Sequence, residues 1–294
     1  MRTRAELALV GVTIIWGTTF VMVKSALQEI STVLFLTLRF AVAAAVLAII
    51  YRNKLNRRGV KPSILAGGLL FAAYVFQTMG LELTTPSKSA FLTGLSIPMV
   101  PLASCLVYRV VPRMAEAAGV LVASFGMALM TLPEGSWGGF HWSMTRGDLL
   151  TIGCAVAFAL HMIVIARYAP VVGFETVAVG QAATAVVLGV LSVPWLEPVR
   201  FHMTTEVAVA VVVTGLFATA LAFTTLAWAQ KHTTATRSAL IFALEPVVAW
   251  ITSYVLTGEV LSLRAQVGAG LILGGVLLVE FRPETKSKAA TSAG

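Results

Sequence analysis

A glutamate followed by a proline lies inside a long apolar stretch near the C-terminal end of the chain. The segment reads ALEPVVAW, and Glu245 and Pro246 have apolar runs on both sides. An ionised carboxylate in hydrocarbon is costly unless it is paired or hydrated. Glu245 is therefore a candidate proton carrier or receptor for a substrate ammonium group. A structural polar group, protonated or bonded to a neighbouring helix, is the alternative.

Pro246 adds to this interpretation because it has no N–H for the carbonyl of Phe242, and its ring crowds the preceding turn. A kink and a free carbonyl are expected beside Glu245, and a broken helix at this depth can line a cavity. A simple packing bend is the alternative. Pro98 and Pro101 lie near the matching depth of an earlier apolar segment, so a similar bend is expected there.

Four other polar side chains lie within apolar segments. Arg39 either extends to the membrane surface or bonds carbonyls of an adjacent helix, and we expect its role to be structural. His161 is a candidate proton relay, although a lone histidine more often makes a satisfied bond between helices. Tyr74 and Gln77 lie one helical turn apart and would present one polar face together.

Large apolar side chains could complete a cavity around these groups. By default they pack in the core or face lipid, but some would contact an apolar substrate or hold a cation against a ring. The candidates are Trp16, Phe20, Met99, Phe158 and Phe242. Gly270 and Gly274 form a GxxxG pattern, which permits close helix packing. We expect it to serve packing within the chain, and a dimer face is the alternative.

The composition defines the environment of these residues. Of the 294 residues 58% are apolar and only 12% are charged, against about 45–50% and about 25% in soluble domains. The mean hydropathy is +0.89. These values predict an all-α polytopic membrane protein whose solvent is the lipid bilayer. The net charge of +8 is then explained by basic cytoplasmic loops rather than by nucleic-acid binding. Cys105 and Cys154 offer no disulfide framework or metal spacing, and no cofactor is expected.

Ten transmembrane helices are expected, because backbone groups in lipid must bond internally and these runs lack the alternation of barrel strands. The first five, within residues 1–132, span about 7–23, 33–51, 64–81, 89–108 and 115–132. An outer loop, 133–148, precedes the second five, within residues 149–281, at about 149–166, 176–193, 207–229, 238–256 and 265–281. Residues 282–294 are expected to be a disordered cytoplasmic tail.

The basic residues predict the orientation of these helices. With the N-terminus inside, the inner loops and termini hold most of the 21 Lys and Arg residues. By the positive-inside rule both termini are then cytoplasmic, in a cell (inner) membrane.

The second half of the chain resembles the first. The segment from Thr84 (TTPSKSAFLTGLS) matches the segment from Thr233 (TTATRSALIFALE) at an offset of 149 residues. An offset of 142 residues aligns the IIWGTTF segment with VAFALHM and Arg39 with Gln181. Because five is odd, the second set of helices must enter the membrane upside down. Two five-helix inverted-topology repeats of this kind are typical of secondary transporters, in which two related halves alternate around one midplane site.

Several short motifs now resemble a known family. They are Trp16-Gly17, Leu38-Arg39-Phe40, Glu245-Pro246 and the segment TGEVLSLRAQVGAGLILGGVLL at 257–278. Together they resemble the drug/metabolite transporter superfamily, EamA-like branch, over about residues 5–281, with YddG-type amino-acid exporters as a neighbour. The resemblance implies ten helices in two inverted repeats, with helices one, three, four, six, eight and nine around a cavity. It implies export of amino acids, including aromatic ones, of other metabolites or of cationic drugs. The first repeat departs from the fuller family pattern, because it has YRVVP at 108–112 where the second repeat has TGEVL at 257–261.

Other functions make demands that the sequence does not meet. A nucleotide-sugar or phosphate-ester exchanger needs basic side chains in the cavity, where Glu245 would repel anions. A membrane-embedded enzyme needs clustered metal ligands or a nucleophile with its base, and no HExxH or GxSxG motif is present. We therefore expect a secondary exporter rather than an enzyme. A passive channel, coupling to protons, the substrate and the oligomeric state stay open.

Overall fold

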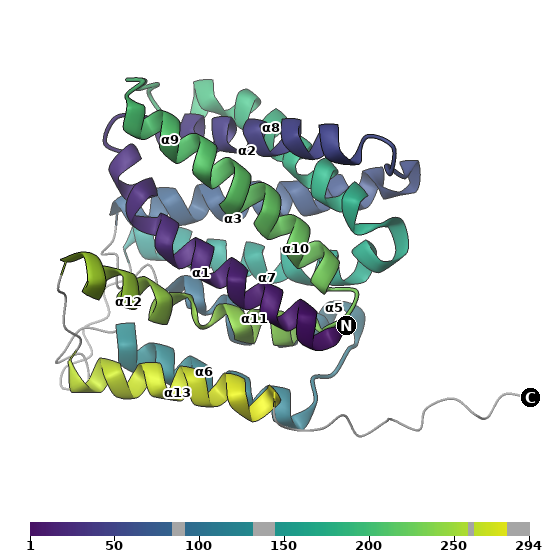
Figure 1. The fold of residues 1–294 in the computed structure, drawn as a ribbon, viewed down its shortest axis with the longest axis vertical. Helices are drawn as coiled ribbons and strands as arrows, with labels where there is room; N and C mark the ends of the chain where they lie inside the picture. Colours follow the sequence, from purple (N-terminus) through teal and green to yellow (C-terminus); the bar gives the residue numbers. More distant parts are fainter. Residues whose placement is uncertain (84–91, 132–144, 258–261, 281–294) are drawn as a thin grey trace, which may run out of the picture.

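The computed structural model describes residues 1–83, 92–131, 145–257 and 262–280, and nearly all of them are helical (Figure 1). The elements are α1 (Arg2–Ala26), α2 (Thr32–Tyr51), η1 (Arg57–Gly59), α3 (Val60–Leu83), α5 (Ser96–Tyr108), α6 (Met114–Thr131), α7 (Arg146–Val172), α8 (Phe174–Leu196), α9 (Thr205–Val213), η2 (Thr214–Leu221), α10 (Ala222–Ala229), α11 (Ala235–Phe242), α12 (Glu245–Thr257) and α13 (Leu263–Glu280). The predicted outer loop falls almost wholly, and the predicted tail entirely, outside the described residues.

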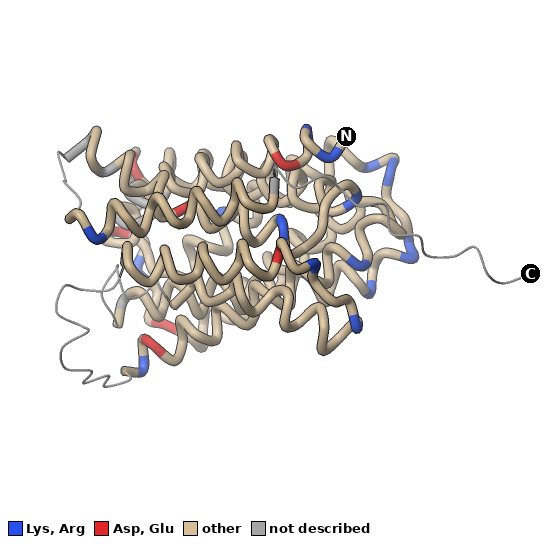
Figure 2. The backbone as a smooth tube through the Cα atoms, turned by 90° about the horizontal axis from the view of Figure 1, so that it is seen from below, with Lys and Arg blue, Asp and Glu red and all other residues tan. Residues whose placement is uncertain are grey.

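Length and composition identify this as a multi-pass membrane protein. Within the described part, six helical segments are long and apolar enough to cross a bilayer, and three shorter ones are also apolar. Many large apolar side chains point outward, including Trp195 at 85% exposed and Leu106 at 83% exposed. Such a surface fits lipid rather than water as its solvent. Figure 2 places most Lys and Arg residues at the end of the bundle that carries the N-terminus.

Helices α6 and α13 pack against each other along their length and form a layer of their own in Figure 1. Gly126 meets Gly268, and Gly119 meets Gly275, so closely that an added Cβ would lie 2.4–2.8 Å from the opposite carbonyl oxygen. Gly270 and Gly274, expected to serve packing within the chain, instead lie on the exposed face of α13 with no atom near the Cβ position. The glycine contact therefore uses the other side of the same helix.

Two membrane segments are interrupted within the described residues. The segment containing α11 and α12 is interrupted at Ala243 and Leu244, and the segment containing α5 is interrupted at Leu95. In each, a leucine N–H bonds the carbonyl three residues earlier, from Leu244 to Ile241 and from Leu95 to Leu92. Proline follows within three residues in both cases and cannot continue the α-helical ladder.

A further irregularity lies between α9 and α10, where η2 is a π-helical stretch of eight residues within one continuous helix. Wide turns of this kind are uncommon and frequently occur at functional sites. Gly215 lies in this stretch, and an added Cβ would be 3.0 Å from the carbonyl oxygen of Arg39. The close approach brings α2 against η2. Helix α5, by contrast, continues through Pro101 without a break.

Candidate functional site

The break between α11 and α12 determines the position of Glu245. Glu245 is the first residue of α12, so its carboxylate lies beside backbone N–H groups that begin a helix and favour negative charge. The side chain is only partly buried. Among the described residues, no hydrogen bond or ion pair reaches its carboxylate. The Tyr74 hydroxyl and the Cys154 thiol lie within its electrostatic reach.

The Trp16-Gly17 motif brings α1 against this break. An added Cβ at Gly17 would lie 2.8 Å from the Val248 side chain and 3.1 Å from the Ala249 nitrogen, so only glycine permits this approach to α12. The Trp16 ring packs 4.8 Å from that of Phe242, directly before the break, and its Nε1–H donates to the Ala218 carbonyl at 2.8 Å. The motif thus joins three helices around Glu245.

Five aromatic rings continue from Trp16 into the centre of the bundle. The ring centroid of Phe223 in α10 lies 5.5 Å from that of Trp16 and 6.2 Å from that of Tyr74. The ring centroids of Tyr74 and Phe158 are 5.5 Å apart. With Phe242 these residues form what we call the aromatic cluster. The central position of Phe223 could not be predicted from the sequence. A helix that is apolar on every side has no periodicity that distinguishes a ring at the centre of the bundle from a ring that faces lipid.

Arg39 enters this region from α2 instead of extending to the membrane surface. It is only 4% exposed. Its Nε–H donates to Thr219 Oγ1 at 2.6 Å, and its Nη2 donates to the Tyr74 hydroxyl at 3.1 Å and to the Ala218 carbonyl at 3.2 Å. The guanidinium also lies 4.7 Å from the centre of the Tyr74 ring. Of the two sequence expectations for Arg39, bonding to an adjacent helix is the one observed.

The π-helical stretch supplies the acceptors for these donors. The Ala218 carbonyl receives both Arg39 and Trp16, and Thr219 receives Arg39. The wide turn thereby joins α1 and α2 at one point. No sequence feature predicted the π-helical stretch, since η2 is as apolar as the helices around it.

His161 is fully buried between α7 and α8. Its Nε2 lies 2.8 Å from Gln181 Oε1, and its ring meets that of Phe223 edge-on at 5.6 Å. The interhelical bond expected for a lone histidine is therefore present. His161 Nδ1 and Gln181 Nε2 have no hydrogen-bond partner in the described part of the chain.

The other predicted candidates lie at different distances from this centre. Met99 and Phe242 pack against a group of buried residues that includes Val100 and Ala159. Gln77 is partly buried and takes part in none of the ring contacts given above. Pro98 lies in the first turn of α5. The side chain of Phe20 is outside the described part.

The described residues contain no group of three His, Cys, Asp or Glu side chains that could hold a metal ion. What the geometry provides is a carboxylate, an arginine and several rings at the meeting point of broken or irregular helices. Discontinuous helices around a midplane site are the arrangement of membrane transporters.

Comparison with known proteins agrees with this class. The model of the EamA-like transporter family matches residues 3–132 and 145–281. An uncharacterized transporter of Archaeoglobus fulgidus is 31% identical over 283 residues, which cover 96% of this chain and 87% of the relative. The uncharacterized transporter YyaM of Bacillus subtilis is 27% identical over 92% of this chain and 91% of the relative. A protein of known crystal structure, 22% identical, shares the fold with a TM-score of 0.78 over 95% of this chain and 96% of that chain.

The chain belongs to the EamA-like transporter family, a branch of the drug/metabolite transporter superfamily. It is a transporter rather than an enzyme.

Proposed function

We propose that this protein is a secondary exporter of small metabolites that carry an amino group, with amino acids, including aromatic ones, and cationic drugs as its substrate class. The observation that carries the proposal is Glu245, a partly exposed carboxylate at a helix break with no partner among the described residues. A substrate ammonium would pair with it. The neighbouring rings of Trp16 and Phe242 provide faces for a cation or an aromatic side chain.

Transport would proceed by alternating access between two inverted five-helix repeats. The aromatic cluster supports such a symmetry. The sequence offset of 142 makes Trp16 equivalent to Phe158, and the offset of 149 makes Tyr74 equivalent to Phe223. The contact of Trp16 with Phe223 then repeats that of Phe158 with Tyr74, and both centroid distances are 5.5 Å. Tyr74 and Phe223 also contact each other, as a pair astride a two-fold axis would.

The glycine contacts support the same axis. Under the 149-residue offset Gly119 corresponds to Gly268 and Gly126 to Gly275, so the offset maps the contact of Gly119 with Gly275 onto the contact of Gly268 with Gly126. That reciprocity is the property of an isologous contact. The breaks at Leu95 and Leu244 are also 149 residues apart. Two halves that share one scaffold and break at the same position could exchange shapes around a common site.

Ten membrane spans with both termini in the cytoplasm complete the proposal. The count is supported by the described helices, which overlap the ten apolar segments of the sequence, and the orientation is supported by the basic residues, which gather at the N-terminal end (Figure 2). At that end Arg237 is ion-paired with Glu6 of α1 and Glu116 of α6. These buried pairs tie the inner ends of three helices together, which supports a conformation closed toward the cytoplasm.

A phosphate-ester exchanger fits the centre less well. Arg39 already donates to Thr219, Tyr74 and Ala218, and the nearby carboxylate of Glu245 would repel a phosphate. Whether a proton accompanies the substrate is decided by the same carboxylate, because Glu245 would exchange a proton for a substrate cation in a coupled cycle.

The test is counterflow in proteoliposomes with radiolabelled amino acids and a cationic dye. We expect uptake by the wild type and a rate about 10- to 100-fold lower for Glu245→Gln, since a charge-assisted contact is lost. Glu206→Gln removes an exposed carboxylate from the start of α9 and serves as the matched control. Normal counterflow by Glu245→Gln would make the carboxylate structural. No transport of any amino compound by correctly inserted wild-type protein would refute the exporter proposal.

A further inference from the structure

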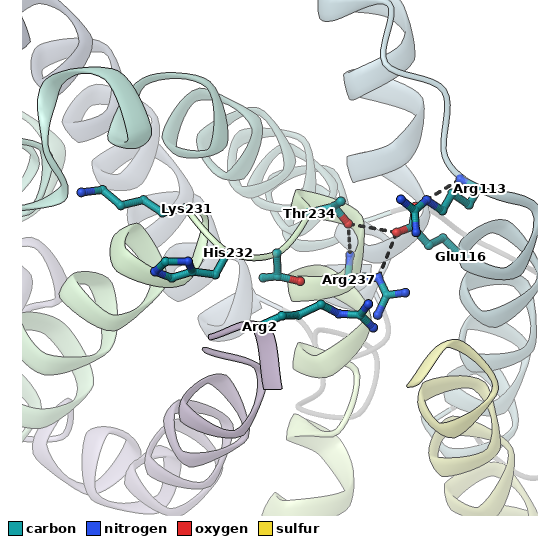
Figure 3. Close-up of a pocket in the computed structure, with 8 residues that line it drawn as sticks. Arg2, Arg113, Glu116, Lys231, His232, Thr234 and Arg237 are labelled. Atoms are coloured by element: carbon teal, nitrogen blue, oxygen red, sulfur yellow. Dashed lines mark hydrogen bonds and ion pairs between the residues drawn. The ribbon is translucent and has the colours of Figure 1, made fainter. Parts of the chain in front are cut away.

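A second polar region lies far from the aromatic cluster, at the end of the bundle that carries the N-terminus. It is an open pocket of about 250 Å³ (Figure 3). We call it the basic pocket, and it is lined by Arg2, Arg113, Glu116, Lys231, His232, Thr233, Thr234 and Arg237. These residues come from the starts of α1 and α6, from α11 and from the connection between α10 and α11. The transport proposal makes no use of it.

Positive charge exceeds negative charge in the basic pocket. Four of its side chains are Lys or Arg, and Glu116 is its one lining acid. Glu6 lies behind the wall, where its Oε1 accepts from Arg2 at 2.9 Å, Arg237 at 3.3 Å and Thr233 at 3.1 Å. Even with both carboxylates counted, two positive charges are in excess.

The two carboxylates are already engaged in holding the wall together. Glu116 accepts from Arg237 Nε at 3.1 Å, from Thr234 at 3.2 Å and from the Arg113 backbone N–H at 3.1 Å. Their hydrogen bonds fix the guanidinium of Arg237, which is buried. The side chains of Arg113 and Lys231 are exposed at the rim. A buried guanidinium held in place, with two exposed cationic side chains at the rim, is suited to bind an anion.

The backbone adds to this preference. Helices α1, α6 and α11 begin at Arg2, Met114 and Ala235, so three helix N-termini lie at the basic pocket. Each contributes a partial positive charge from N–H groups at the helix start. Arginine forks and helix N-termini are the groups that bind phosphate most often in proteins. The volume suits a single phosphate-bearing headgroup better than a drug-sized ligand.

We propose that the basic pocket binds a phosphate group, supplied either by the headgroup of an anionic phospholipid or by a soluble phosphate. The pocket lies at the basic end of the bundle, which in the proposed orientation would face the membrane surface, and basic pockets at that level bind anionic headgroups. A phosphate held there would bridge α1, α6 and the connection before α11. It would therefore brace the same helix ends that the Arg237 pairs hold together.

The test uses purified protein in phosphatidylcholine nanodiscs with two probes, short-chain phosphatidylglycerol and inorganic phosphate. Native mass spectrometry counts bound lipid, and thermal unfolding reports binding of either probe. We expect saturable binding by the wild type, weakened about fivefold for each basic side chain removed in Arg113→Gln and Lys231→Gln. The control is Arg57→Gln with Arg58→Gln, which removes two exposed charges from η1 at the same end.

The two probes separate the sources of the phosphate. Binding of phosphatidylglycerol alone assigns the pocket to a lipid, and binding of inorganic phosphate with the same variant sensitivity assigns it to a soluble ligand. Equal binding of both probes by the wild type and by the Arg113/Lys231 variant would overturn the proposal. So would a loss of binding confined to the Arg57/Arg58 control. Neither result depends on which substrate the protein transports.

Discussion

Arg39 is held at the centre of the protein by neutral acceptors, and none of the hydrogen bonds found for it in the described structure involves a carboxylate. A buried cation is costly in a membrane unless its donors are satisfied. The planar guanidinium satisfies this demand by reaching two residues of the π-helical stretch and one tyrosine at once. The Tyr74 hydroxyl then lies between Arg39 and the electrostatic reach of Glu245. One tyrosine thus accepts a hydrogen bond from the buried cation in the neighbourhood of the partly buried carboxylate.

Arg39→Lys retains the charge but removes the fork. An ammonium cannot reproduce the Nε and Nη2 hydrogen bonds together, so we expect the free energy of unfolding to fall by about 2–4 kcal/mol. Thermal unfolding in detergent, followed by tryptophan fluorescence, measures the change. Arg58→Lys, at an exposed position, should leave the midpoint unchanged. A stable Arg39→Lys protein would show that charge alone matters at this position.

The sequence located the polar residues within apolar helices but did not predict how those helices are rotated. Hydropathy located Glu245 and Arg39 within the membrane, and Pro246 predicted the break beside Glu245. Hydropathy could not predict that Arg39 turns toward Tyr74, because a helix apolar on all sides has no polar face to orient it. For the same reason Gly270 and Gly274 were expected to serve packing within the chain, whereas Gly268 and Gly275 on the other face make the contact.

At the level of elements, short side chains decide which helices approach each other. Gly126 and Gly268 let α6 and α13 touch backbone to backbone, and Gly17 does the same for α1 and α12. In lipid, where burial of apolar surface gives no net drive, this close packing supplies much of the attraction between helices. Single methyl groups at these positions should therefore have large effects.

Gly126→Ala tests this packing. Its Cβ would lie 2.6 Å from the Gly268 carbonyl oxygen and 2.8 Å from the Ile272 nitrogen, so the two backbones must separate. We expect a loss of about 1–3 kcal/mol in the free energy of unfolding. Gly270→Ala is the matched control, because it adds the same methyl group to α13 where nothing lies within 4 Å. Equal unfolding midpoints for the two variants would contradict the contact.

At the level of the whole molecule, the charge distribution gives the bundle two unlike ends. The basic pocket, η1 and the N-terminus lie at one end, whereas Glu29 and Glu197 lie in or beside the connections at the other. Insertion into a membrane retains Lys and Arg on the cytoplasmic side. The orientation of the entire chain is therefore a consequence of a small number of loops.

Cysteine labelling measures this orientation. In a background with Cys105→Ser and Cys154→Ser, we expect His202→Cys to react with an impermeant maleimide from outside right-side-out vesicles. Arg57→Cys should react only after permeabilisation. Both positions are exposed, so accessibility does not limit the reaction. The opposite pattern would reverse the topology, and labelling of both positions from one side would contradict an odd number of crossings between Arg57 and His202.

The π-helical stretch determines which residue reaches the centre of the second half. At its start, Gly67 and Gly215 correspond under the proposed repeat, because they pack against the carbonyl oxygens of Gln181 and Arg39 respectively, and they lie 148 residues apart. After it, Tyr74 and Phe223 are equivalent at 149. A π turn spans one residue more than an α turn and takes up the difference. One residue rotates every later side chain by about 100°. Without that rotation Ala222 would stand opposite Tyr74, and the ring of Phe223 would face away from the aromatic cluster.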